Sequence, residues 1–362
     1  ENHELKIRMY ERALELDPDN AQTYFRLAWA RREEGSPAEA ERLIRRALEF
    51  FPQGAMWRSD LAFMIADQGR YEEAMAELER AIELNPLLAQ NYRTLGIWQM
   101  FHFGRIDEAI INFRKAYALD PEAGFIASGI AINYRHLGMK TEAYAWIDRA
   151  LELSPTRAWV WVLAAAVHGT FGDDELAMDD HRRCLELAPT HHISLKALAT
   201  RDIEQNRWAL ARERWGQAYP ELVYPEPPAV NARNIDAAVA YAINLEQVGL
   251  TGEAKRMVER IGEVVAGLPP DSDSAEFYRS YIAMFVDPDP DRMIRELRTQ
   301  IVDNHQRAEL DFYEPEYDIV RDRPEFQELV RIVEEDLARQ RERLRAMERN
   351  GEMPPAPGVE LR

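Results

Sequence analysis

Apolar and polar positions follow a helical period along most of the chain, and the same phase returns about every 34 residues. Prolines mark this repeat and are spaced by 34 or 35 residues: Pro18, Pro52, Pro86, Pro121, Pro155 and Pro189. A repeat of this length is typical of two antiparallel helices per unit. The pattern therefore predicts an all-α chain in which each helical hairpin packs against the next.

Small residues recur in step with the prolines and predict where the helices approach most closely. The first set lies ten residues after each proline: Ala28, Ala62, Gly96, Ala131, Ala165 and Ala199. The second set lies on the other helix of each hairpin: Ala40, Ala74, Ala109, Ala143, Ala177 and Ala211. The third set lies where one hairpin meets the next: Ala47, Ala81, Ala116, Ala150, Cys184 and Ala218. Larger side chains would push the backbones apart, so we expect all three sets to be buried.

The turn between the two helices of each repeat has its own signal. Five glycines and one asparagine stand at this position: Gly35, Gly69, Gly104, Gly138, Gly172 and Asn206. Both residue types accept the left-handed conformation that ends a helix. Large apolar residues such as Leu61, Phe113 and Trp215 are expected to fill the core between the helices.

Several segments resemble the consensus of the tetratricopeptide repeat family. They are YERALELDP at residues 10–18, GRYEEAMAELERAIELNP at 69–86 and GRIDEAIINFRKAYALDP at 104–121. The resemblance covers roughly residues 1–220 and implies a right-handed α-solenoid with a general protein-binding role. It does not name a ligand.

The pattern divides the chain into five parts. They are the second helix of a partial repeat followed by six repeats (1–220), a proline-rich and extended linker (221–231), degenerate helical hairpins (232–310), a capping-helix region (311–350) and a mobile tail (351–362). Helices are expected at 232–248, 252–265, 275–286, 291–302 and 324–349. Because the first hairpin lacks its first helix, we expect the chain to be the C-terminal part of a larger protein or to lack a few upstream residues.

The long helix at 324–349 is expected to seal the last hairpin with one apolar face: Phe326, Leu329, Val330, Ile332, Val333 and Leu337. The run Arg-Asp-Arg-Pro-Glu-Phe at 321–326 resembles the ending of bacterial tetratricopeptide modules attached to class III adenylate or guanylate cyclases, or to winged-helix regulators. That resemblance implies that this chain belongs to a larger signalling protein.

First-helix positions that are not needed for hairpin packing should line an inner groove. The candidate partner-binding residues are Trp29, Phe63, Arg93, Phe125, Ile132, Trp159, Val162 and Lys196. The apolar stripe in the fourth and fifth repeats predicts a groove for an apolar peptide or a partner helix. It is equally compatible with a cover formed by the chain's own C-terminal helices or by a second copy, so homo-oligomerisation stays open.

Charge and length limit the partners. The 362 residues carry a formal net charge of -19, which disfavours phosphate backbones, so no direct binding of nucleic acid is expected. Basic segments are favoured at long range. The most apolar stretch, residues 158–171, is shorter than the ~20 residues needed to cross a bilayer, so no membrane insertion is expected. A single cysteine fits the cytoplasm or the periplasm and does not separate them.

No catalytic motif is present in the sequence, and no cofactor is expected. His168, His181 and Cys184 could approach one another, but they occupy core positions and lack an evident fourth ligand, so we expect buried side chains and no metal. The basic clamp with which some family members hold a C-terminal carboxylate is expected to be absent, because Arg26, Arg93 and Lys196 lie in separate repeats. The favoured function is a protein-interaction scaffold or sensor module; the alternatives are a structural oligomerising element and an enzyme with an unfamiliar site in residues 232–310.

Overall fold

The computed structural model describes residues 2–268, 289–303, 317 and 319–359. Every regular element in these residues is a helix, which confirms the all-α prediction. The chain forms two compact units, and two helices, α8 (Gly124–His136) and α19 (Pro324–Arg349), contribute residues to both.

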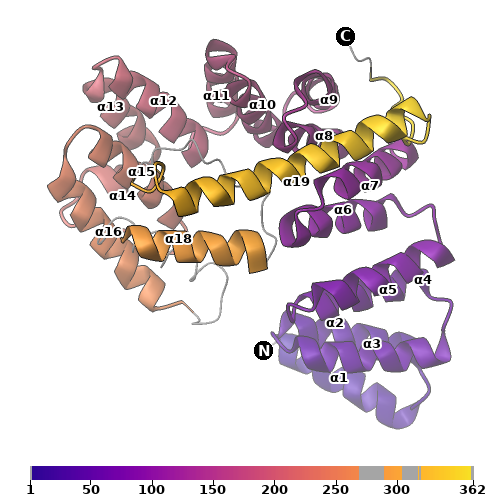
Figure 1. Cartoon of the computed structure of the whole chain (residues 1–362). Helices are drawn as coiled ribbons and strands as arrows, with labels where there is room; N and C mark the ends of the chain where they lie inside the picture. The colour runs from indigo at the N-terminus through magenta and orange to yellow at the C-terminus, as the bar shows by residue number, and fades with distance from the viewer. Residues whose placement is uncertain (1, 269–288, 304–316, 318, 360–362) are drawn as a thin grey trace. The chain divides into compact units, whose positions relative to one another are not determined.

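Unit 1 comprises residues 1–126, 304–309 and 337–358. Its helices, apart from its parts of α8 and α19, are α1 (Asn2–Leu16), α2 (Ala21–Glu33), α3 (Pro37–Phe50), α4 (Ala55–Ala66), α5 (Tyr71–Leu84), α6 (Ala89–Phe103) and α7 (Ile106–Leu119). The first and second helices of each hairpin pair as α2 with α3, α4 with α5, and α6 with α7 (Figure 1).

Unit 2 comprises residues 127–303, 310–336 and 359–362. Its helices, apart from its parts of α8 and α19, are α9 (Lys140–Leu153), α10 (Ala158–Thr170), α11 (Asp174–Leu187), α12 (His192–Glu204), α13 (Trp208–Ala218), α14 (Pro220–Val223), α15 (Ile235–Gln247), α16 (Thr251–Ala266), α18 (Pro290–Arg298) and the π-helix η1 (Thr299–Asp303). The hairpins α10/α11, α12/α13 and α15/α16 follow one another, and α15 packs on α12.

The predicted repeat register is confirmed. Each second helix ends two residues before its proline, as α3 does at Phe50 before Pro52. All six predicted turn residues have positive φ, including Asn206 at 58°. At Gly104, with φ of 61°, the backbone N–H returns to the carbonyls of Gln99 and Met100 and closes α6. The left-handed turn thus satisfies carbonyls that the helix end would otherwise leave unpaired.

The small residues occupy close helix contacts, as the sequence predicts. All members of the three sets are buried except Ala218, which is partly buried. Gly96 shows the steric reason most clearly. A Cβ atom on Gly96 would lie 2.8 Å from the Phe113 ring and 3.1 Å from the carbonyl oxygen of Ala109. Glycine therefore stands opposite the large ring of Phe113. In the preceding hairpin the corresponding residues are Ala62 and Leu78, so an alanine is accommodated where the opposite side chain is smaller.

Replacing Gly96 with alanine is expected to lower the free energy of unfolding by about 1 to 2 kcal/mol. The steric cost should exceed the ~1 kcal/mol that alanine gains in helix propensity. Adding Phe113→Leu should recover part of the loss, which a double-mutant cycle in urea denaturation would measure. An additive cycle, or a more stable Gly96→Ala variant, would contradict the packing argument.

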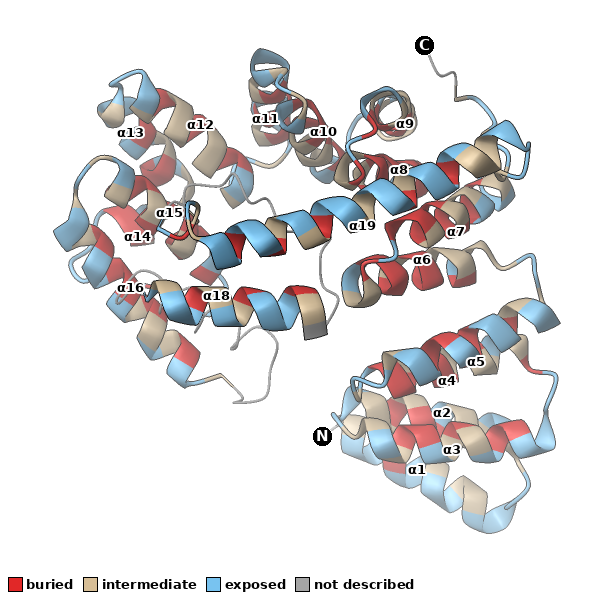
Figure 2. Cartoon of the chain, viewed as in Figure 1, coloured by how far each residue is buried: buried red, intermediate tan, exposed pale blue. Residues whose placement is uncertain are grey.

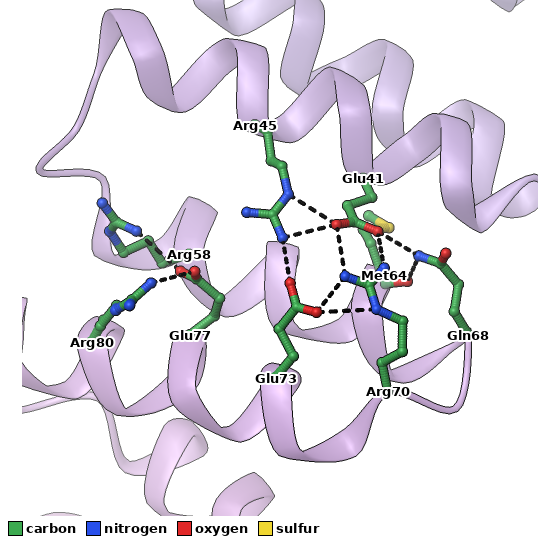
Figure 3. Close-up of polar contacts among 9 residues, drawn as sticks. All are labelled: Glu41, Arg45, Arg58, Met64, Gln68, Arg70, Glu73, Glu77 and Arg80. Atoms are coloured by element: carbon green, nitrogen blue, oxygen red, sulfur yellow. Dashed lines mark hydrogen bonds and ion pairs between the residues drawn. The ribbon is translucent and has the colours of Figure 1, made fainter.

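A polar network joins the first two complete hairpins across α3 and α5 (Figure 3). The nearly buried carboxylate of Glu41 accepts hydrogen bonds from Arg45 Nε at 2.9 Å, Arg70 Nη1 at 2.7 Å and Gln68 Nε2 at 2.7 Å. Burial alone would raise the pKa of Glu41, but the hydrogen bonds from Gln68, Arg45 and Arg70 hold it below its usual value. Arg45 also reaches Glu73 at 2.7 Å, so ion pairs supplement the apolar contact between repeats.

The segment that follows α13 corrects one prediction. Residues 221–231 do not form an extended linker, because the segment begins within the short helix α14 and Ala229 N donates back to Glu221 O at 2.9 Å. Leu222, Val223 and Val230 are buried in the core of unit 2. Their apolar side chains fold the segment onto α13 and α15, despite its prolines.

The degenerate hairpins agree with the prediction where the structure describes them. Helices α15 and α16 match the expected ranges within a few residues, and the predicted stripe of Met293, Leu297 and Ile301 on α18 and η1 is buried. The helix expected at 275–286 lies outside the described residues.

Helix α19 has the predicted bounds and carries its buried residues along one side (Figure 2). In unit 2, Phe326, Leu329 and Val333 are buried, whereas Val330 and Ile332 are only partly so. From residue 337 onward the helix belongs to unit 1. Its second half therefore does not cap the last hairpin, contrary to the prediction made from the sequence for the whole helix.

The second half of α19 packs against the turn between α6 and α7. Gln340 Oε1 accepts from the backbone N–H groups of Ile106 at 2.7 Å and Asp107 at 3.1 Å, while its Nε2 donates to Gly104 O at 2.8 Å. Arg343 Nε donates to the buried Asp107 carboxylate at 2.5 Å. Beyond the helix, the Tyr117 hydroxyl donates to the carbonyl of Pro357 at 3.1 Å, so this part of the expected mobile tail contacts α7.

Candidate functional site

The inner-facing side chains of unit 1 lie on α2, α4, α6 and the start of α8. Trp29, Phe63 and Arg93 are partly exposed there, and Phe125 is 45% exposed. The hairpin register puts these residues on first helices, on the side that does not face the second helix of the same hairpin. They are the positions at which a solenoid can present side chains to a partner.

Trp29 and Phe63 are brought together by an arginine that the sequence reading did not single out. The guanidinium carbon of Arg32 lies 5.0 Å from the Trp29 ring centroid and 5.9 Å from the Phe63 ring centroid. Arg32 also forms an ion pair with Asp67, in which Nη2 donates to Oδ1 at 3.1 Å. The sequence could have indicated the contact with Trp29, because Arg32 follows it by three residues on the same helix and such residues are neighbours on a helix surface.

Asp60 lies beside this cluster and has an unusual protonation equilibrium. Burial raises its pKa from 3.8 to about 6, against the opposing effects of Arg32 and of a hydrogen bond from Trp29. The carboxyl group is therefore partly neutral near pH 6. Its charge depends on pH in a range where an ordinary aspartate stays ionised.

This shift makes stability depend on pH with a definite sign. Between pH 3.8 and about 6 the folded chain holds the Asp60 proton more tightly than the unfolded chain, so stability falls as pH rises through this window and stays level above it. Asp60→Asn removes the effect and keeps an acceptor for Trp29. We expect the variant to exceed the wild type by about 1 to 2 kcal/mol at pH 8, allowing for partial exposure of the group, and to lose that advantage near pH 4. Urea denaturation of both proteins across this range measures the difference; a difference that is constant with pH would contradict the assignment.

Arg93 and Phe125 form a second contact in unit 1. The Arg93 guanidinium carbon lies 5.5 Å from the Phe125 ring centroid, and Arg93 Nε donates to Gln90 Oε1 at 3.1 Å. Desolvation lowers the pKa of Arg93, and no carboxylate opposes this effect. Among the residues that the structure describes, Arg93 forms no ion pair.

The other four predicted residues belong to unit 2. Ile132 lies on α8, Trp159 and Val162 on α10, and Lys196 on α12. All are at least partly exposed, Trp159 by 38%. The eight residues predicted as one groove thus divide into two sets of four, one on each unit, and their role in binding stays a prediction.

Two histidines and the cysteine of unit 2, His168, His181 and Cys184, are buried and have polar neighbours. His168 Nδ1 lies 2.6 Å from Asp180 Oδ2, and His181 Nδ1 lies 3.1 Å from Ser194 Oγ. Burial lowers the pKa of His181 to about 4 and raises that of the Cys184 thiol. Across the described residues, no three His, Cys, Asp or Glu side chains come together in a way that could hold a metal ion.

No helix in the described part of the chain is both long and apolar enough to cross a membrane. In α10, the helix within the apolar stretch 158–171, Val160, Ala164 and Val167 are fully buried.

Comparisons with known proteins agree with this architecture. Models of the tetratricopeptide repeat match residues 9–42 and 66–86. Among solved structures, yeast Tom70 is 17% identical with a TM-score of 0.56, over 82% of this chain and 60% of that chain. A tetratricopeptide repeat protein from Parabacteroides merdae is 12% identical with a TM-score of 0.54, over 72% of this chain and 98% of that chain. No curated protein gives a significant match.

The hairpins and their inner-facing side chains define the chain as an α-solenoid of paired antiparallel helices. With the repeat models matched at residues 9–42 and 66–86 and the register confirmed at each turn, the chain contains tetratricopeptide repeats. The resemblance of its C-terminal region to modules attached to cyclases or winged-helix regulators stays a prediction.

Proposed function

We propose that the chain is a protein-interaction scaffold that binds a peptide or a partner protein through inner-facing side chains of its first helices. The observation that carries this proposal is the apolar area exposed at these positions, on Phe125 and Met56 in unit 1 and on Trp159 and Ile193 in unit 2. Exposed apolar side chains that cluster on one face are typical of interaction surfaces. Tetratricopeptide repeats are also typically interaction modules without enzymatic activity.

The partner segment expected on this surface is apolar, with a length set by the succession of first helices within each unit. Each first helix presents a few side chains, so a peptide lying across several of them gains affinity from repeated small contacts. We also propose, from the C-terminal resemblance, that the scaffold serves a larger signalling protein. Nothing in the arrangement of residues 232–268 or 289–303 favours the enzyme alternative over this one.

An array of random-sequence peptides with blocked ends tests the proposal. Full-length protein should bind a subset of peptides, and Phe125→Ala or Trp159→Ala should weaken that subset. Phe50→Ala is the matched control, because Phe50 is also 38% exposed but lies on the second helix α3. Circular dichroism confirms that each variant is folded.

Equal binding by all three variants, or no bound peptide at all, would contradict the proposal. Light scattering separates the homo-oligomer alternative. A mass that rises with concentration and returns to that of a monomer in Trp159→Ala would assign the surface to a second copy of the chain.

A further inference from the structure

We propose that Arg93, stacked on Phe125, binds the side-chain carboxylate of an aspartate or glutamate in the partner segment. This inference rests on the proposed function, because it assigns one contact within the same surface. It replaces the expectation, drawn from net charge, that charged residues of the partner are basic, and it adds one acidic contact to the apolar segment proposed above.

The first argument is the state of the guanidinium group. Most arginines of unit 1 form ion pairs with carboxylates, for example Arg32 with Asp67 and Arg70 with Glu41. Arg93 instead contacts a neutral amide and an aromatic ring, although it is only partly exposed. A partly desolvated cation without an opposite charge is costly, and a partner's carboxylate would relieve that cost.

The second argument is geometry. The contact of the guanidinium with the Phe125 ring, 5.5 Å from the ring centroid, and the hydrogen bond from Nε to Gln90 Oε1 at 3.1 Å restrain the group on two sides. Its two terminal nitrogens have no hydrogen-bond partner among the described residues. A planar fork that is fixed at its base and open at its end matches a carboxylate in bidentate geometry.

The third argument is local charge. The inner-facing side of α2, α4 and α6 carries three arginines, Arg26, Arg32 and Arg93, and two acids, Asp60 and Asp67. Arg32 is paired with Asp67, whereas Arg26 and Arg93 form no ion pair among the described residues, and Asp60 is partly neutral near pH 6. This surface is therefore locally basic in a chain of net charge -19. Remote charges are screened beyond about 10 Å in 0.1 M salt, so the local arginines decide which group binds in contact.

The peptide array tests the inference through Arg93→Gln. Arg46→Gln is the matched control, because Arg46 also stacks on a phenylalanine, with its guanidinium carbon 4.7 Å from the Phe50 ring, but it lies on α3 and is paired with Glu49. Both variants remove one positive charge. Peptides bound by the wild type should be enriched in aspartate and glutamate, and Arg93→Gln should weaken them about tenfold to a hundredfold while Arg46→Gln leaves them within about twofold.

A cycle across the interface identifies the interacting group. Changing the acidic residue of a selected peptide to its amide should weaken wild-type binding by the same factor as Arg93→Gln, and combining both changes should add little. Binding that Phe125→Ala abolishes but Arg93→Gln leaves intact overturns the Arg93 assignment and leaves the scaffold proposal standing. Absence of any bound peptide overturns both. A parallel array presents the same peptides with free carboxyl ends. If Arg93→Gln weakens binding of those peptides alone, Arg93 binds a chain end and not an acidic side chain, and the proposal is overturned.

Discussion

Replacing Trp215 with alanine is expected to lower the free energy of unfolding of unit 2 by about 4 kcal/mol, the largest single effect predicted for this chain. Trp215 is fully buried on α13, with ring centroids 5.3 Å from Tyr241 and 6.1 Å from Tyr219. Its removal leaves a cavity among side chains of α13 and α15 that cannot fully close.

The indole also donates a hydrogen bond. Replacing Trp215 with phenylalanine separates the effect of losing this bond from the effect of losing side-chain volume. Trp215 Nε1 donates to Asn244 Oδ1 at 2.8 Å, and Asn244 Nδ2 donates to Thr200 Oγ1 and to Gln247 Oε1, each at 2.9 Å. Trp215→Phe keeps much of the volume but leaves Asn244 Oδ1 without its donor. We expect this variant to cost about 2 kcal/mol, intermediate between wild type and alanine.

Urea denaturation followed by far-ultraviolet circular dichroism measures these differences. Trp208→Ala is the control on the same helix, because Trp208 is only partly buried and should cost less than half as much. A loss below about 1 kcal/mol for Trp215→Ala would show that the core of unit 2 is not packed as described.

Replacing Gln340 with leucine is expected to release the second half of α19 from α7, at a cost of about 3 kcal/mol. The N-terminal N–H groups of a helix have no partner within the helix. The residue preceding α7, Arg105, makes no side-chain capping bond, and Gln340 supplies one from a distant segment instead. Leucine retains the volume but leaves two N–H groups and the carbonyl of Gly104 unpaired in a buried site.

Hydrogen exchange provides the measurement for this variant. Amides of residues 340–349 should exchange about a hundredfold faster in Gln340→Leu than in the wild type, while those of α4 and α5 remain unchanged. Glu342→Leu introduces the same side chain at an exposed position of the same helix and should change exchange little. Unchanged protection in Gln340→Leu would mean that apolar contacts such as that of the fully buried Leu344 suffice to hold the helix.

For the proposed binding surface, the sequence gives positions on the first helices but not the electrostatic environment of the side chains there. Counting from the prolines places Trp29, Phe63 and Arg93 on the inner side of first helices, because the hairpin register repeats. The repeat register could not predict that Arg32 contacts both Trp29 and Phe63, or that Arg93 has no carboxylate partner among the described residues. Such contacts depend on the side-chain conformations of neighbouring repeats, and these follow from packing.

The sequence by itself determined the hairpins, their turns and their close contacts, since each of these involves residues within one repeat or its neighbour. Gly96 opposite Phe113 and the left-handed Asn206 are set by steric limits that a period of 34 or 35 residues makes visible. Only the tertiary structure decided where Gln340 binds, because its partners at Gly104 and Ile106 lie more than 230 residues earlier in the chain. A single polar residue such as Gln340 within an otherwise apolar stripe does not indicate which helix end it caps. Its partners are the unpaired backbone groups that lie near it once the chain has folded.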